Sequence, residues 1–291
     1  DLAPCLSHGR VLGLGEVMDY TDVIKGDREL HAKLELFRKR VIDGHAPGLS
    51  PEDLSAYALA GINTDHECID YRYALEHLRR GLTVLIREGS AAKNLEAIVR
   101  GIVEHNLDTS NFCFCTDGKH LEDVQKVGHM DYCLKKAVSL GLDPVKAIKM
   151  ATIQAARTYG LKHLGAIAPG RQADLVILGS LTEMDVQQVY HKGVLLKSQE
   201  RIEVKPAPKA LMNTIHLTEF NAAQLALPNP GQTFPVIKVL EGQITTEELP
   251  AVIPGNEFFE PNGEFNKIAV IERHGKTGQT GVGVIAGFNI K

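Results

Sequence analysis

Short apolar runs alternate with stretches of helical period over the first 117 residues of the chain. The apolar runs lie near residues 10–18, 39–48, 56–67, 81–90 and 110–118, and the helical stretches lie near 27–40, 51–59, 70–80 and 91–105. Strands that alternate with helices are typical of a parallel sheet with helical crossover connections. The expected helix at 51–59 also begins with an N-cap serine, Ser50, and a first-turn proline, Pro51. The sequence therefore predicts an α/β fold.

Each apolar run passes directly into polar or ionisable side chains at its C-terminal end. These side chains are Glu16, His45, His66 with Glu67, Arg87 with Glu88, and Asp117. In a parallel barrel, active-site residues gather at the C-terminal ends of several strands. Five such strands in so short a span fit the second half of a (β/α)8 barrel, whose usual length is roughly 250 residues. We therefore predict strands 4 to 8 of a TIM-like (β/α)8 barrel, with the first three strands preceding Asp1.

Three regions are expected along the chain. They are a partial barrel segment at 1–160 with a helical part over 121–160, a small unit of β-sandwich strands beside the barrel at 161–205, and a partial C-terminal α/β region at 206–291. Within the last region, strands are expected near 236–240, 267–273 and 282–290, after a linker-like segment at 205–210. Because the chain begins at Asp1 and ends directly after an apolar run, we expect a fragment that lacks the N-terminal part of the barrel and its own C-terminal end.

Composition favours a cytoplasmic protein whose partner is a small molecule. The net charge is −4 with acidic and basic residues interspersed, which gives no basic face for nucleic acid and no polybasic membrane patch. No apolar run approaches the roughly 18 residues of a membrane span, and no secretory signal opens the chain. The five cysteines include no C-x2-C pair, so buried thiols are expected in place of a structural zinc site.

Two histidines and two carboxylates at separate strand ends form a mixed nitrogen and oxygen ligand set. Such a set suits Mn²⁺, Fe²⁺ or Zn²⁺ better than Ca²⁺. A bound metal lowers the pKa of water from roughly 15.7 to about 7, which supplies hydroxide at neutral pH. Each position alone is weak evidence for a metal site, because a strand-end histidine is more often structural and Asp117 before Gly118 is also typical of a turn or helix cap. The serial order of the residues carries the prediction.

That order, glutamate, histidine, histidine, a strand without a ligand and then aspartate, resembles the second half of the metal site of the amidohydrolase superfamily. The sequences GLGEVMDY, IDGHAPGLS, AGINTDHE, LIREGSAAKNL and FCTDGKHLED are similar to those of the microbial-type adenine deaminases, and the similarity covers nearly the whole chain. The resemblance implies hydrolytic deamination of adenine to hypoxanthine and ammonia in purine salvage. It also implies two divalent metal ions, Mn²⁺ or Fe²⁺ before Zn²⁺, and we expect a homo-oligomer, a dimer.

Carried over by position, the resemblance assigns roles to individual residues. Glu16 would bridge the two metals, His45 and His66 would bind the second metal, and Asp117 would bind the first. Asp117 would also take a proton from the water that attacks C6 of adenine. No two histidines lie two residues apart, so the His-x-His pair of the superfamily's first strand is absent from this sequence.

Several positions depart from the superfamily pattern. Gly48 stands where related deaminases carry a proton-shuttle glutamate, and Gly118 stands where the family has a second acid. Glu67 is our candidate shuttle, with a helix-cap role as the alternative. Arg87 and Ser90 are candidates for substrate contact, with loop roles as the alternative.

Two other functions stay open at the level of sequence. One is an amidohydrolase of hydantoinase or dihydropyrimidinase type acting on a cyclic amide; Glu16 argues against it, because those enzymes usually bridge their metals with a carboxylated lysine. The other is a non-catalytic barrel scaffold, which would be marked by lost ligands.

Overall fold

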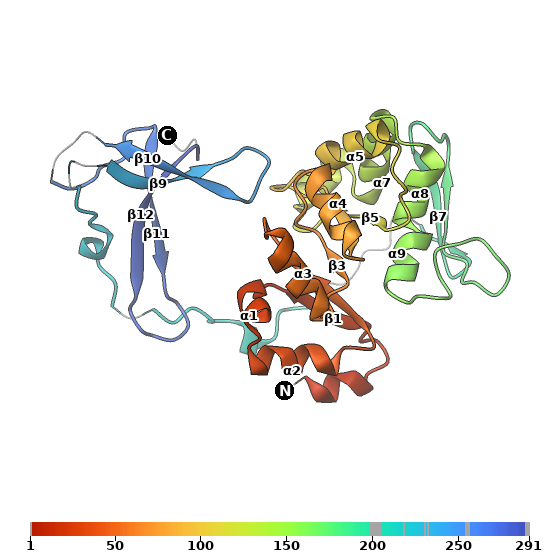
Figure 1. The fold of residues 1–291 in the computed structure, drawn as a ribbon, viewed down its shortest axis with the longest axis horizontal. Helices are drawn as coiled ribbons and strands as arrows, with labels where there is room; N and C mark the ends of the chain where they lie inside the picture. The colour runs from red at the N-terminus through yellow and green to blue at the C-terminus, as the bar shows by residue number, and fades with distance from the viewer. Residues whose placement is uncertain are drawn as a thin grey trace. The chain divides into compact units, whose positions relative to one another are not determined.

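The structure, a computed structural model, describes residues 2–197, 205–217, 219–229, 231, 233–253 and 257–288. The chain divides into two compact units, Asp1–Ser198 and Gln199–Lys291, which are described separately. Figure 1 labels the main elements of both. In the part of the chain that the structure describes, no helix is both long and apolar enough to cross a membrane.

The first unit is built on a five-stranded sheet in which every strand pairs in parallel with its neighbour in sequence. Its strands are β1 (Gly13–Val17), β2 (Val41–Gly44), β3 (Thr64–Asp65), β4 (Thr83–Arg87) and β5 (Phe112–Cys115), in the order β1-β2-β3-β4-β5. The expected α/β fold is therefore confirmed. Because all five strands run the same way, their C-terminal ends meet along one edge of the sheet.

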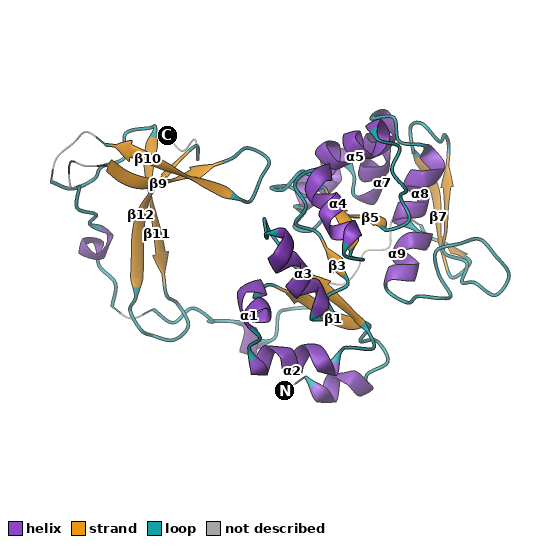
Figure 2. Ribbon diagram, viewed as in Figure 1, coloured by secondary structure: helices purple, strands orange, loops and turns teal. Residues whose placement is uncertain are grey.

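Helices connect these strands, as Figure 2 shows. They are α1 (Tyr20–Lys25), α2 (Arg28–Leu36), α3 (Pro51–Leu59), α4 (Tyr71–Arg79) and α5 (Leu95–Glu104), after a short 3-10 helix, η1 (Ala3–Ser7). The expected N-cap is present, because Ser50 Oγ accepts a hydrogen bond from Asp53 N at 3.1 Å. The helix expected over 27–40 ends earlier, at Leu36, and the Arg40 side chain beyond it donates hydrogen bonds to the carbonyl oxygens of Val11 and Leu6.

The apolar side chains of the strands and helices form two buried clusters. One packs β1 and β2 against α1, α2 and α3 and includes Leu34, Ile42 and Tyr57. The other packs β4 and β5 against α4, α5 and the following helices. Both clusters lie under the crossover helices, so the polar ends of the strands remain available at the edge of the sheet.

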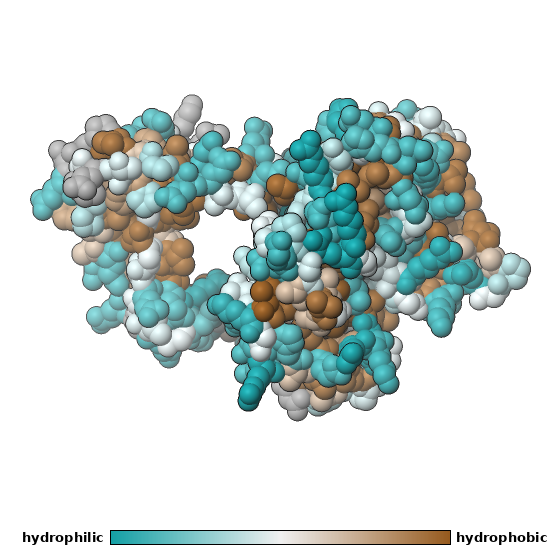
Figure 3. Space-filling view, viewed as in Figure 1, coloured by the Kyte–Doolittle hydropathy of each residue, from teal (hydrophilic) through white to brown (hydrophobic). Residues whose placement is uncertain are grey.

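The rest of the first unit is helical and then antiparallel. The helices are α6 (Leu121–Val127), α7 (Met130–Ser139), α8 (Pro144–Ala151) and α9 (Ile153–Thr158), and the strands are β6 (Leu175–Leu178), β7 (Val186–His191) and β8 (Val194–Leu195) in the order β6-β7-β8. The helical part expected over 121–160 is thus four separate helices. Exposed apolar side chains, including Val176 and Val194, lie on the three-stranded sheet, and Figure 3 shows this apolar surface in brown.

The second unit is a four-stranded sheet. Its strands are β9 (Thr233–Val239), β10 (Thr246–Val252), β11 (Phe265–Ile271) and β12 (Thr280–Ala286), in the order β10-β9-β12-β11, with only the β12–β9 pair parallel among them. The predicted α/β character of 206–291 is wrong for the described residues, whose only helices there are the short 3-10 turns η2 (Lys209–Leu211) and η3 (Ala222–Leu225). Prolines 206, 208 and 228 disfavour a regular helix in this segment.

Strand β10 was absent from the sequence prediction. Its sequence, TEELPAV, contains consecutive glutamates and Pro250, which are uncommon within strands. The strand lies at the edge of its sheet, where proline is tolerated. The last expected strand ends at Ala286, and its final predicted positions, 289–290, lie outside the described residues.

Gly44, the last residue of β2, allows the close approach of β3. A Cβ atom at this position would overlap the carbonyl oxygen of Thr64 and lie 2.8 Å from Ile62 Cγ2. We therefore expect Gly44→Ala to lower the free energy of unfolding by about 1–3 kcal/mol, as overpacking does. Gly15→Ala, in β1 of the same sheet, adds a methyl group in open space and should not destabilise the protein. Equal urea-unfolding midpoints for the two variants would contradict this assignment.

Candidate metal centre

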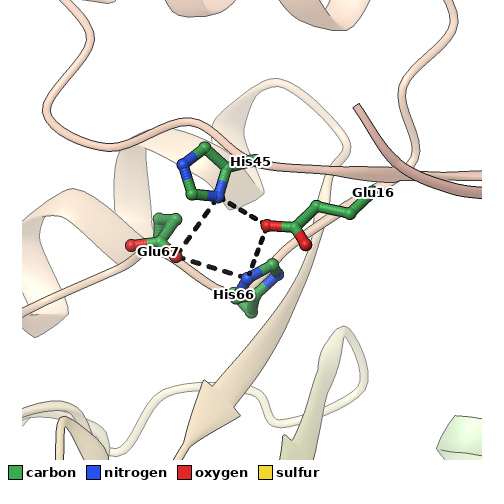
Figure 4. Close-up of side chains that lie close together, drawn as sticks. All are labelled: Glu16, His45, His66 and Glu67. Atoms are coloured by element: carbon green, nitrogen blue, oxygen red, sulfur yellow. Dashed lines mark ion pairs between the residues drawn. The ribbon is translucent and has the colours of Figure 1, made fainter. Parts of the chain in front are cut away.

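Four ionisable side chains from three neighbouring strand ends converge at the C-terminal edge of the parallel sheet. Glu16 lies in β1, His45 directly follows β2, and His66 and Glu67 directly follow β3. Figure 4 shows the four side chains pointing toward one another. One ligand atom from each lies within 4.8 Å of the other three. Glu16, His45 and His66, which the sequence placed at separate strand ends, thus lie together in this structure.

The distances define a compact ring of nitrogen and oxygen atoms. His45 Nδ1 lies 2.6 Å from Glu16 Oε1 and 3.4 Å from Glu67 Oε1. His66 Nε2 lies 3.3 Å from each of the same two oxygens. The pairing of β1 with β2 shifts register between Leu14 and Val17, and such irregularities re-aim side chains, which accounts for the inward direction of Glu16.

The residues fit a divalent cation. His45 Nδ1 is buried and makes no well-aligned hydrogen bond to any described residue, although two carboxylate oxygens lie close to it. A metal ion bound between this ring nitrogen and the two carboxylates would give the buried nitrogen a partner. Two imidazoles with carboxylate oxygens suit Mn²⁺, Fe²⁺ or Zn²⁺.

The charges of the cluster shift the pKa values of two of its members. Burial alone would raise the pKa of Glu67, but hydrogen bonds to His66 and Arg87 outweigh it and lower the pKa to about 2. Burial alone would lower the pKa of His66, but its hydrogen bond to Glu67 and the charges of Asp65 and Glu16 outweigh it and raise the pKa. Without a metal ion, the cluster therefore favours a protonated His66 beside an ionised Glu67.

Arg87 is enclosed beneath the cluster, with only 1% of its side chain exposed. Its Nη1 and Nη2 atoms donate to the two oxygens of Glu67 at 2.5 and 3.0 Å, which is the bidentate geometry of a strong ion pair. Nη1 also donates to Asp117 Oδ2 at 3.2 Å. The guanidinium thus joins the ends of three strands, and its predicted contact with substrate stays a prediction.

Asp117 lies outside the group of four residues that converge. It follows β5 with a backbone φ of +50°, and its side chain, 46% exposed, reaches Arg87. Aspartate tolerates this left-handed conformation better than most residues. Its assignments as metal ligand and proton acceptor stay predictions, and Glu67 joins the convergent group in its place.

Ser90 belongs to the loop after β4. Its hydroxyl donates to a carboxylate oxygen of Asp123 and accepts a hydrogen bond from His120 N at 2.8 Å. This side chain therefore links the loop after β4 to the start of α6, and contact with substrate stays a prediction.

Two buried side chains beneath the cluster were not predicted from the sequence to be part of the site. Tyr57 Oη accepts a hydrogen bond from His45 N at 2.9 Å and donates one to the carbonyl oxygen of Val17 at 2.7 Å. Asp65 binds backbone N–H groups beside both histidines. The signal for Asp65 was a charged residue within an apolar run, directly before His66.

A parallel sheet with a histidine–carboxylate cluster at one edge is the arrangement expected of an α/β metallo-hydrolase fold. The model of the amidohydrolase family matches residues 3–196, and the chain therefore belongs to this family.

Among relatives, the adenine deaminase of Desulfitobacterium hafniense (strain Y51) is 54% identical over 290 residues, which is 99% of this chain and 51% of that protein. The adenine deaminase of Petrotoga mobilis is 40% identical over 96% of this chain and 50% of that protein. The chain thus spans about half the length of the curated relatives it matches.

A solved structure, the β-aspartyl dipeptidase of Fervidobacterium islandicum AW-1, matches 68% of this chain and 62% of its own chain with a TM-score of 0.52. At 16% sequence identity, this likeness concerns the fold alone.

Arg87→Met should destabilise the protein, because it leaves the buried carboxylate of Glu67 without its cation. Breaking a buried ion pair in this way costs about 3–5 kcal/mol. Arg100→Met, which removes an exposed pair with Glu96 on α5, is the matched control and should change the stability little. Urea unfolding at neutral pH measures both variants, and a similar small effect for both would show that the Arg87–Glu67 pair contributes little.

The raised pKa of His66 predicts the pH dependence of metal binding. An imidazole must be neutral to bind a metal, so the proton on His66 competes with the ion. The affinity for Mn²⁺ should therefore rise as the pH increases through the raised pKa, and calorimetric titration should record proton release on binding.

In the metal-free protein, the raised pKa of His66 stabilises the fold at low pH, and this contribution to the free energy of unfolding is lost as the pH rises through the raised pKa.

His31→Gln is the control for this titration. His31 lies on α2 and contacts Val23 O, away from the cluster, so the variant should keep the pH dependence of the wild-type protein. An affinity that does not change with pH would contradict the assignment of His66 as a ligand.

Proposed function

We propose that this chain carries the metal-binding part of a hydrolase that converts adenine and water into hypoxanthine and ammonia. The observation that carries the proposal is the convergence of Glu16, His45 and His66 at neighbouring strand ends. The likeness to proteins named adenine deaminase supports the choice of substrate. The same proposal places β1 to β5 as strands 4 to 8 of a (β/α)8 barrel.

In this proposal, Glu16, His45 and His66 hold divalent cations, with Glu16 shared between two ions. Mn²⁺ or Fe²⁺ is favoured over Zn²⁺. When bound, the metal would lower the pKa of water to about 7 and so supply hydroxide at neutral pH. Asp117, half-exposed at the adjoining strand end, is proposed as a further ligand and as the group that takes up the proton of the attacking water.

The surroundings of Glu67 disfavour the proton-shuttle role that was expected from the sequence. A proton shuttle must gain and lose a proton near neutral pH, whereas the pKa of Glu67 is about 2 and both of its oxygens accept hydrogen bonds from Arg87. The two hydrogen bonds from Arg87 favour an ionised Glu67 that serves as ligand or as counter-charge for the histidines. Arg87 is proposed to hold Glu67 and Asp117, and Ser90 to support the neighbouring loop.

We also propose the cellular process, the compartment and the assembly in which this activity takes place. Deamination of adenine belongs to purine salvage, a cytoplasmic process. A homodimer is proposed as the assembly, with a small-molecule substrate as the partner of the site.

The test is ammonia release from adenine by the full-length protein loaded with Mn²⁺. Glu16→Gln should reduce the number of bound metal ions and should lower turnover by at least the roughly 10–100-fold that loss of a group supporting a metal ligand costs. Glu29→Gln, which removes an exposed carboxylate from α2, is the control and should leave both unchanged. Normal turnover with two bound metals in Glu16→Gln would refute the bridging role. Hydrolysis of cyclic amides in place of adenine would refute the assignment of adenine as the substrate.

A further inference from the structure

Asp65 lies directly before His66 and is completely buried. Its Oδ1 atom accepts a hydrogen bond from Ala46 N at 2.7 Å, and its Oδ2 atom accepts one from Glu67 N at 2.9 Å. Ala46 follows His45, and Glu67 follows His66. One carboxylate therefore binds the backbone directly beside both histidines of the cluster.

A buried histidine on α4 lies beside the same carboxylate. His77 Nε2 lies 3.1 Å from Asp65 Oδ2, and His77 itself is completely buried. The other ring nitrogen, Nδ1, lies 2.9 Å from Tyr73 O and 3.4 Å from Cys68 Sγ. Asp65 thus accepts hydrogen bonds from the backbone at two strand ends and lies against a crossover helix on its other side.

Asp65, Cys68 and His77 also lie close enough together to suggest a second metal site. However, Asp65 faces Nε2 of the imidazole and Cys68 faces Nδ1. His77 Nδ1 already lies 2.9 Å from the carbonyl oxygen of Tyr73, which can only accept a hydrogen bond, so the ring nitrogen that faces Cys68 is not free to bind an ion. The group is therefore better explained as support for Asp65 than as an ion site.

Both backbone hydrogen bonds require a carboxylate. An asparagine has one oxygen and one NH2 group, so one of the two backbone N–H groups would face another donor and stay unpaired in a buried place. The loop after β2 or the loop after β3 would then shift. Because each loop begins with a histidine, the shift would change the separation of the two ring nitrogens.

We propose that Asp65 is a positioning residue that sets the spacing of His45 and His66 and thereby the affinity of the centre for its metal ion. The assignment rests on the proposed metal-dependent function. It adds a residue that contacts neither metal nor substrate and acts through the backbone of both histidine loops.

The test compares Asp65→Asn with Asp43→Asn in the full-length protein. Asp43, on β2, is a matched control, because it accepts hydrogen bonds from Thr64 Oγ1 on β3 at 2.7 Å and from Tyr159 Oη, after α9, at 3.0 Å, and among the described hydrogen bonds it accepts none from the backbone of the histidine loops. An asparagine oxygen can still accept from these hydroxyls. The probe is Co²⁺, whose visible absorption depends on the geometry of its ligands.

Asp65→Asn should bind Co²⁺ about 10–100-fold more weakly than the wild-type protein, as loss of a group that orients metal ligands does. Its Co²⁺ absorption spectrum should also change, a readout that a loss of stability alone would not produce. Asp43→Asn should keep the wild-type affinity and spectrum. Circular dichroism checks that each variant is folded.

Wild-type affinity and spectrum in Asp65→Asn would overturn the assignment, as would an equal loss in Asp43→Asn. If Asp65→Asn does not fold, Asp65→Glu replaces it, because it keeps both oxygens but displaces them by one methylene, and the same weakening is expected. Failure of the wild-type protein to bind Co²⁺ would overturn the proposed metal-dependent function, and this assignment with it.

Discussion

Parallel pairing of five successive strands is the constraint on which the rest of the first unit depends. Because β1 to β5 run in one direction, the residues that follow each strand share one edge of the sheet. Glu16, His45 and His66 are far apart in sequence, yet they meet there without any long loop to carry them. The crossover helices bury the apolar faces elsewhere, which leaves this edge to polar chemistry.

Gathering carboxylates at one edge carries an electrostatic cost that Arg87 offsets. Glu67 is almost completely buried, and an unpaired charge there would be strongly unfavourable. The bidentate contact with Arg87 stabilises the carboxylate, and the same guanidinium reaches Asp117. A buried cation thus organises the acidic residues around the histidines, while Asp65 and Tyr57 hold the backbone from which the histidines project.

Much of this arrangement could be predicted from sequence, because it depends on local patterns. Apolar runs that end in His45, His66 and Asp117 indicate strand ends, and Ser50 with Pro51 indicates a helix start. The buried contacts of Arg87 could not be predicted, since its partners, Glu67 and Asp117, lie 20 and 30 residues away. The edge strand β10 was missed because its consecutive glutamates and Pro250 are uncommon in strands, and sequence does not reveal that it lies at the edge of a sheet.

The sequence by itself determined the alternation of strands and helices and the chemical identity of the side chains at each strand end. Those properties follow from local periodicity and composition, which need no knowledge of the fold. Only the tertiary structure decided which side chains face one another: that Glu67 joins the histidines, that Asp117 turns to Arg87, and that Asp65 binds the backbone beside both histidines. Distances between residues on different strands depend on register and packing, and these are settled only when the whole sheet assembles.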